Sequence, residues 1–143
     1  MILAHLMSGV LLLIALLHVL WGLGIVWPLR DESAFVDAVV GFRQADRMPS
    51  TMACMAVAVV LSCAAAVAQL LTGPGVLVPS PVSTLLGIAL SAVFLIRGVI
   101  TYAPLWRSIT PRQPFARLDA TLYGPLCLCL GTGFAMLVAM SDG

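Results

Sequence analysis

The spacing of charged residues constrains this chain more than any other feature of its sequence. Asp, Glu, Lys and Arg are absent from three long stretches, residues 1–29, 48–96 and 120–141. A helix needs about 20 predominantly apolar residues to cross the hydrocarbon core of a bilayer. The first and last stretches are therefore long enough for one span each and the middle stretch for two, which predicts four membrane-spanning helices.

Turn residues divide the middle stretch, because Gly and Pro cluster at 73–75 and again at 79–81. Lipid accommodates only helices or closed barrels, and these stretches are too long and uniform for barrel strands. The first stretch is nearly twice the core of a cleavable signal peptide and has no Lys or Arg before it, so we expect a span there. The predicted fold is an all-α integral membrane four-helix bundle in a single domain, 1–143. Its helices are expected at about 3–27, 49–72, 83–103 and 118–140.

Composition agrees with a lipid environment. Of the residues, 62% are hydrophobic and only 9% are charged, whereas a soluble domain carries about 25% charged residues. The formal net charge of +1 excludes nucleic acid as a partner, because that interaction needs a concentrated basic surface. The chain cannot cover itself with a solvated surface, so we expect membrane lipid around it.

The distribution of arginine predicts the orientation in the membrane. The chain has no lysine, and six of its seven basic residues lie in the first and third loops. They are Arg30, Arg43, Arg47, Arg107, Arg112 and Arg117. The positive-inside rule then places both loops in the cytoplasm and both termini outside (N-out/C-out), in a multi-pass protein of the bacterial inner membrane. The opposite orientation is the alternative, since a functional cluster at one end produces the same bias.

Two further features concern packing. Asp31 or Ser33 can cap a short helix in the first loop, and we expect an interfacial segment at about 33–45 that lies along the membrane surface. Small residues at four-residue spacing on the second and fourth helices predict close helix contacts. They are Cys54, Ala58, Ser62 and Ala66, and Cys127, Gly131, Ala135 and Ala139. Pro125 predicts a kink or break beside Gly124.

Polar side chains within the spans are costly and are candidates for function. His18, Arg97, Asp119 and Tyr123 all lie toward the charged-loop end, with Tyr102 at the end of the third helix. Two interpretations stay open. The first is a brace, in which Arg97 pairs with Asp119 or reaches the headgroups. In the second, the pair and His18 surround a polar pocket.

Other chemistry is not indicated. His5 and His18 lie about 19.5 Å apart along a helix and on different faces, so they cannot clamp one haem iron. The four cysteines form neither a CxxC motif nor a zinc-type spacing. We expect no metal and no cofactor. Phosphate loops, nucleophile elbows and paired catalytic carboxylates are absent from the sequence, and whether the protein is an enzyme stays open.

Three motifs carry a resemblance to a known family. They are HVLWGLGIVWP at 18–28, FLIRG at 94–98 and PFARLDATLYGPLCL at 114–128. Together they resemble the small bacterial membrane proteins grouped as domain of unknown function 3995. The resemblance implies a four-helix integral membrane protein and no particular activity. It also implies that several candidate residues belong to the family pattern, namely His18, Trp21, Arg97, Arg117, Asp119 and Tyr123.

The leading functional hypothesis is a polar pocket at the charged-loop end for a lipid-like or other amphipathic molecule. Its candidate ligand-binding residues are His18, Trp21, Arg97, Tyr102, Trp106, Arg117, Asp119 and Tyr123. One alternative is a structural or accessory membrane subunit, in which the same residues form an interhelical brace and the small-residue stripes contact a partner or a second copy. A small transporter is the other, and it would have to work as an oligomer.

Overall fold

The computed structural model describes residues 1–43, 47–73 and 80–141. These residues form helices and contain no strand. In chain order, the elements are α1 (Ile2–Gly22), α2 (Glu32–Phe35), η1 (Val36–Val40), α3 (Thr51–Leu70), α4 (Ser80–Ile100), α5 (Pro104–Ile109), α6 (Phe115–Leu118), η2 (Asp119–Tyr123) and α7 (Gly124–Ser141). The elements η1 and η2 are π-helical turns.

Four helices are long and apolar enough to cross a membrane. They are Ile2–Gly22, Thr51–Leu70, Pro81–Ile100 and Phe115–Ser141. The last of these runs through α6, η2 and α7 as one continuous helical segment. The predicted set of four apolar helices is confirmed, whereas the orientation in a bilayer stays a prediction.

The first helix is shorter than predicted. It ends at Gly22 and not at residue 27, because the chain turns at Gly24, which adopts the left-handed φ of +81°. The amides of Leu23, Gly24 and Ile25 donate to carbonyl oxygens of the last helical turn and so terminate it. A second difference is that α4 begins at Ser80, three residues before the predicted start.

The predicted interfacial segment is helical over a shorter range than 33–45. The α2 helix begins at Glu32 after Asp31, whose carboxylate accepts a hydrogen bond from the Ala34 amide (2.8 Å). The helical stretch ends with η1, because Gly41 adopts a φ of +69° at its C-terminus. Residues 44–46 lie outside the described residues.

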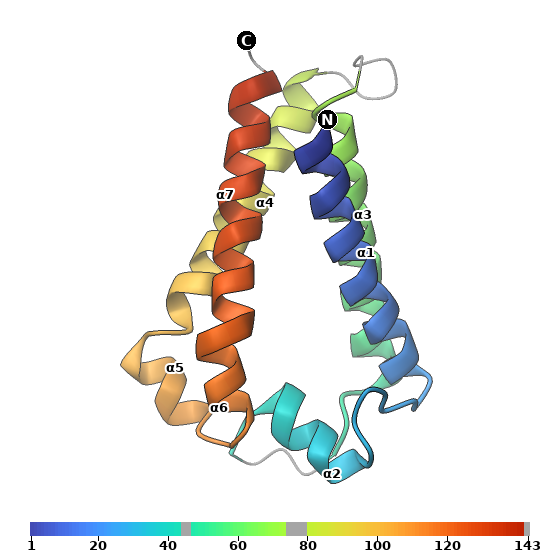
Figure 1. Cartoon of the computed structure of the whole chain (residues 1–143), viewed down its shortest axis with the longest axis vertical. Coiled ribbons are helices and arrows are strands. Elements are labelled where there is room, and N and C mark those ends of the chain that lie inside the picture. Colours follow the sequence, from blue (N-terminus) through green and yellow to red (C-terminus); the bar gives the residue numbers. More distant parts are fainter. Residues whose placement is uncertain (44–46, 74–79, 142–143) are drawn as a thin grey trace.

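The four long helices form two antiparallel pairs, α1 with α3 and α4 with α7 (Figure 1). The pairs converge at the end that holds both termini and diverge toward the other end, where α2 and η1 lie between them. The main apolar core lies at the converged end. It consists of Ala4, Met7, Leu11, Ala64, Ala65, Val67, Ala68, Leu71, Leu130, Phe134 and Leu137. The predicted bundle is therefore tight at one end only.

The small-residue stripes are correct in part. Cys54, Ala58 and Gly131 are buried, and a Cβ at Gly131 would lie 2.7 Å from Leu95 Cγ. Cys127 is half-buried. Four other predicted members are exposed, because the contact line alternates steps of three and four residues and drifts away from a strict four-residue row. They are Ser62, Ala66, Ala135 and Ala139.

The predicted irregularity near Pro125 is present as a π-helical turn. Pro125 has no amide hydrogen to donate within the helix. The segment Asp119–Tyr123, which ends two residues before Pro125, adopts π-helical geometry, and α7 continues from Gly124. The helix therefore changes its winding at this point without ending.

Candidate functional site

The polar cluster of the charged-loop end is centred on Asp119, the first residue of η2. This side chain is 1% exposed, and both of its oxygens accept hydrogen bonds. Arg97 Nη2 donates to Oδ1 at 2.7 Å, and the Trp106 indole Nε1 donates to Oδ2 at 2.8 Å. The carboxylate therefore joins α4, α5 and η2 through two charge-assisted contacts.

Arg97 lies in the last turn of α4 and completes the cluster. Its Nη1 donates to Thr101 Oγ1 at 2.6 Å, and its guanidinium carbon lies 5.0 Å from the centroid of the Trp106 ring. The side chain is 34% exposed. Within the described part of the chain, no buried side-chain nitrogen or oxygen lacks a hydrogen-bond partner. We call Arg97, Thr101, Trp106 and Asp119 the Asp119 cluster.

His18 and Trp21 lie in a separate aromatic group on the other helix pair. His18 Nδ1 donates to the Ile14 carbonyl oxygen (2.8 Å), and its ring centroid lies 4.8 Å from that of Trp21. Trp21 packs against Phe35 at 5.1 Å. Among the hydrogen bonds, ion pairs and ring contacts of the described residues, none joins His18 to the Asp119 cluster.

The remaining predicted residues have three different environments. The Tyr102 hydroxyl donates to the Ala120 carbonyl oxygen at 3.0 Å and links the turn after α4 to η2. The Tyr123 hydroxyl donates to the Ala38 carbonyl oxygen at 3.2 Å and reaches across to η1. Arg117 is exposed on α6. Among the hydrogen bonds and cation–π contacts of the described residues, Trp106 is the one predicted aromatic residue that joins the Arg97–Asp119 pair.

Three contacts hold η1 and the following Gly41 against the segment 112–123, which leads into α7 of the opposite helix pair. Arg112 Nη1 donates to Asp37 Oδ1 at 2.9 Å, and Tyr123 bonds to the Ala38 carbonyl. Phe115 lies against Gly41 so closely that a Cβ there would come within 2.1 Å of the ring. We call these three contacts the clasp. Sequence reasoning missed it, because its partners are far apart in the chain and no local pattern indicates their pairing.

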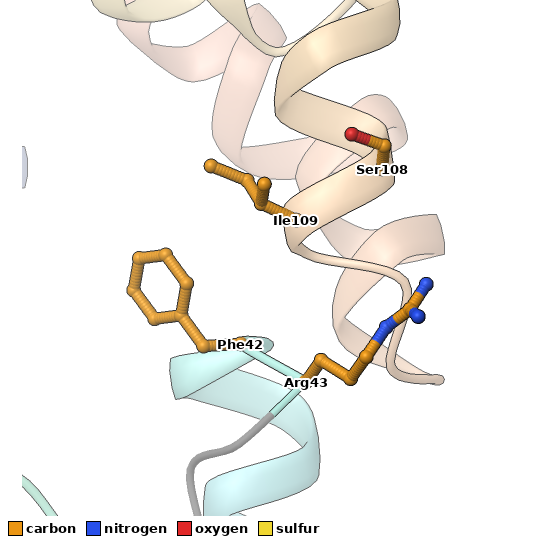
Figure 2. A pocket seen from close by; sticks show the side chains of 4 residues that line it. All are labelled: Phe42, Arg43, Ser108 and Ile109. Atoms are coloured by element: carbon orange, nitrogen blue, oxygen red, sulfur yellow. The ribbon is translucent and has the colours of Figure 1, made fainter.

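The structure has a surface hollow of about 390 Å³ at the charged-loop end. It is lined by Phe42 and Arg43, which follow η1, and by Ser108 and Ile109 of α5. Figure 2 shows Phe42 and Ile109 on one side of it, with Ser108 and the Arg43 guanidinium on the other. The lining of the hollow is thus mainly apolar, with a smaller polar part contributed by Ser108 and Arg43.

The four residues of the hollow are not those predicted for a pocket. The two segments that line it meet through the Arg43 amide, which donates to the Ile109 carbonyl oxygen at 3.4 Å. Phe42 also packs edge-on against Trp106, with ring centroids 6.1 Å apart. The hollow is therefore connected to the Asp119 cluster through one aromatic contact.

The described residues offer no site for a metal ion. No group of three His, Cys, Asp or Glu side chains among them is arranged to hold one.

Outside the spans, hydrogen bonds from the Ala34 amide and then from the Ser33 hydroxyl lower the pKa of the Asp31 carboxyl. That carboxylate is therefore committed to capping α2.

Comparison with known proteins supports the family resemblance. The model of a protein family described as "Protein of unknown function (DUF3995)" matches residues 11–134. This range includes all eight predicted site residues and the four residues that line the hollow. No curated protein and no solved structure matches the chain.

Proposed function

Since the chain belongs to the DUF3995 family of proteins of unknown function, we propose a role from its own geometry: a multi-pass membrane protein that binds an amphipathic molecule at its arginine-rich end. The ligand is a membrane lipid or a lipid-like compound. The binding site is the hollow between Phe42–Arg43 and α5. Four helices long and apolar enough to span a membrane support this proposal, because a membrane-embedded chain meets lipids at the ends of its spans.

The mixed lining of the hollow, mainly apolar with a smaller polar part, carries this proposal. Phe42 and Ile109 offer an apolar surface, and the Arg43 guanidinium and the Ser108 hydroxyl offer polar contacts beside it. An amphipathic molecule needs this combination, with its chain against the apolar side and its headgroup against the cation. Neither a purely polar nor a purely apolar molecule would contact both the apolar and the polar side chains of the hollow.

In this proposal, the Asp119 cluster supports the site and does not line it. Trp106 donates to Asp119 on one side and packs against Phe42 on the other. The Arg97–Asp119 ion pair, of which only Asp119 is buried, therefore holds α5 in position through Trp106, and α5 contributes Ser108 and Ile109 to the hollow. Direct ligand contacts by the eight residues selected from the sequence stay predictions.

The proposed location is the bacterial inner membrane, with the arginine-rich loops in the cytoplasm. Exposed aromatic and aliphatic side chains at this end favour placement at the headgroup level, where amphipathic rings are enriched. Trp27 is 60% exposed and Tyr102 is 49% exposed, and both flank the ends of apolar helices. The hollow would then open toward the cytoplasmic leaflet.

Native mass spectrometry of the protein, extracted gently from its own membrane, tests the proposal. We expect a discrete amphipathic adduct on the wild-type chain and its loss from Arg43→Ala. Arg30→Ala is the matched control, because Arg30 is an exposed arginine of the same end that does not line the hollow. Absence of any adduct, or equal loss in both variants, would contradict the proposal.

One observation favours a second candidate, a structural or accessory membrane subunit. The Asp119 carboxylate accepts hydrogen bonds from Arg97, Thr101 and Trp106. Such a satisfied cluster needs no ligand and serves as an interhelical brace. Retained association with a partner protein or a second copy, without any small-molecule adduct, would favour this candidate.

A further inference from the structure

Resting on the proposed lipid site, we infer that its ligand is an anionic phospholipid with a hydroxylated headgroup. Arg43 binds the phosphodiester, and Phe42 and Ile109 contact the first part of an acyl chain.

The carboxylates of this end determine whether another side chain compensates the charge of Arg43. Those within the described residues are Asp31, Glu32, Asp37 and Asp119. Two are held in ion pairs with Arg112 and Arg97, and the other two accept hydrogen bonds from the backbone amides of Ala34 and Met48. In the described part of the chain, no carboxylate pairs with Arg43. None of these four carboxylates therefore competes with an anionic ligand for Arg43.

The hydrogen-bond donors and acceptors of Arg43 and Ser108 indicate which lipid headgroup fits the hollow. A guanidinium has five N–H donors and no acceptor, and its fork matches a phosphate group. The Ser108 hydroxyl already donates its hydrogen to the Leu105 carbonyl oxygen at 2.7 Å, so it offers an acceptor. An anionic phosphate whose headgroup carries a hydroxyl donor satisfies both residues. A quaternary ammonium headgroup would instead bring a second cation close to Arg43.

The position of the hollow favours a lipid over a soluble phosphate compound. Its α5 wall follows the end of α4 after three residues, so it lies beside the end of a helix of spanning length. Leu105 of the same helix is 76% exposed and Ile109 is 43% exposed. A short helix with these apolar side chains and Arg107 beside them fits the boundary between headgroups and acyl chains. The Arg43 and Ser108 side chains of the hollow thus lie at the level where lipid phosphodiesters are concentrated.

Trp106 provides a reporter for the test. The chain has three tryptophans, and Trp21→Phe with Trp27→Phe leaves the one that packs against Phe42 at the hollow. The protein is placed in mixed bilayers with lipids brominated in the upper acyl chain, which quench tryptophan fluorescence on contact. We expect brominated phosphatidylglycerol to quench Trp106 at about fivefold lower mole fraction than brominated phosphatidylcholine, the ratio for ~1 kcal/mol per arginine near the surface.

Matched variants separate the possible outcomes. Arg43→Gln should abolish the preference for phosphatidylglycerol, and Arg30→Gln should retain it. Equal quenching by both lipids that still weakens in Ile109→Ser would overturn the headgroup assignment and leave the proposed function standing. Quenching that neither Arg43→Gln nor Ile109→Ser changes would overturn both, because Trp106 would then contact only bulk lipid. Circular dichroism of each variant confirms that the helices are retained.

Discussion

Asp119 places a carboxylate within a helical segment that is otherwise apolar enough to span a membrane. Removing such a group from water costs several kcal/mol unless it is paired and fully hydrogen-bonded. Arg97 and Trp106 supply the pairing at 2.7 and 2.8 Å, so both oxygens are satisfied. The pair therefore determines which elements are held together, α4, α5 and η2, and contributes little to the net free energy of unfolding.

This arrangement predicts unequal effects of single and double substitutions. Asp119→Leu leaves the Arg97 guanidinium, which is 34% exposed, and the Trp106 N–H without their acceptor. We expect a loss of about 1–3 kcal/mol in the free energy of unfolding. Replacing both residues, Arg97→Met with Asp119→Leu, should recover most of that loss, because two apolar side chains of similar volume replace a pair that is costly to desolvate. Equilibrium unfolding in detergent measures both values.

The matched control for that series is Arg117→Met, since Arg117 is an exposed arginine two residues before Asp119. We expect a change below about 0.5 kcal/mol for this variant. If Asp119→Leu were as stable as the wild type, the cluster would not be a brace. If the double variant were as unstable as Asp119→Leu, its members would contribute through hydrogen bonds that apolar side chains cannot replace.

Asp31 leads to a prediction about pH. Its folded-state pKa is lowered by hydrogen bonds from the Ala34 amide and the Ser33 hydroxyl, so its capping of α2 contributes fully above the unfolded-state pKa of about 3.9. The contribution is lost as the pH falls through the lowered folded-state pKa. The Ala34 amide chemical shift should report this titration in micelles. Asp31→Asn should keep most of the cap and remove its pH dependence.

Sequence reasoning was most informative for residues whose environment follows from their depth in a span. Arg97 and Asp119 could be paired in advance as one of two interpretations, because both are charged residues near the same end of neighbouring helices. Trp106 and Thr101 could not be assigned to that pair. Their contacts depend on how the chain turns after Ile100, where Pro104 begins α5, and periodicity says nothing about such a turn.

The clasp shows how two short elements join the helix pairs at their diverging end. The segment η1 is fastened to α6 and η2 by Phe115 against Gly41, together with the bonds made by Arg112 and Tyr123. Phe42 and Arg43 come directly after Gly41, so the clasp also positions one wall of the hollow. Loss of the clasp should therefore reduce lipid binding without affecting the apolar core at the other end.

Gly41→Ala tests this at the level of the element. Alanine there would meet two obstacles, a left-handed φ of +69° and the Phe115 ring at 2.1 Å. Gly24→Ala is the matched control, because Gly24 has a φ of +81° and open space around it. The left-handed conformation costs a non-glycine residue about 1–2 kcal/mol. We expect Gly24→Ala to lose that amount and Gly41→Ala to lose more and to release η1.

Hydrogen–deuterium exchange of residues 36–43 is the measurement, with thermal unfolding alongside it. Adding Phe115→Ala to Gly41→Ala should recover part of the lost stability, since it removes the ring that the new Cβ meets. Equal destabilisation by Gly41→Ala and Gly24→Ala would mean that the backbone conformation alone matters. The clasp would then make no contribution through Phe115.

Element boundaries could be predicted where local chemistry decides them. Ser50 accepts a hydrogen bond from the Ala53 amide at 3.2 Å and begins α3 close to the expected residue. The end of α1 was placed five residues too late, because 23–27 is as apolar as the helix before it. Hydropathy cannot separate a helix from an apolar turn, and Gly24 determines the outcome through its backbone conformation.

For the whole molecule, the two helix pairs are joined at both ends by different means. An apolar core joins them where the termini lie, and the clasp joins them where η1 lies between the pairs (Figure 1). The hollow takes one wall from each side of this second junction. A lipid bound there would contact residues that follow η1 and residues of α5 at once. Ligand binding and the spacing of the pairs at this end should therefore be linked.

The antiparallel pairs and the arginine bias together predict which surface of the membrane this junction faces. The first and third loops should lie on the cytoplasmic side and the C-terminal end of α7 on the other.

After the four native cysteines are replaced by alanine, single cysteines are introduced as Ser33→Cys, Gln113→Cys and Ser141→Cys, all at exposed positions. A membrane-impermeant maleimide added to intact cells should label only the third. The same reagent added to inverted membrane vesicles should label the first two. If positions 33 and 113 were labelled from opposite sides, the arrangement of four spans would be wrong. A complete reversal would keep the four spans and place the hollow at the outer leaflet, where Arg43 would meet a different set of lipids.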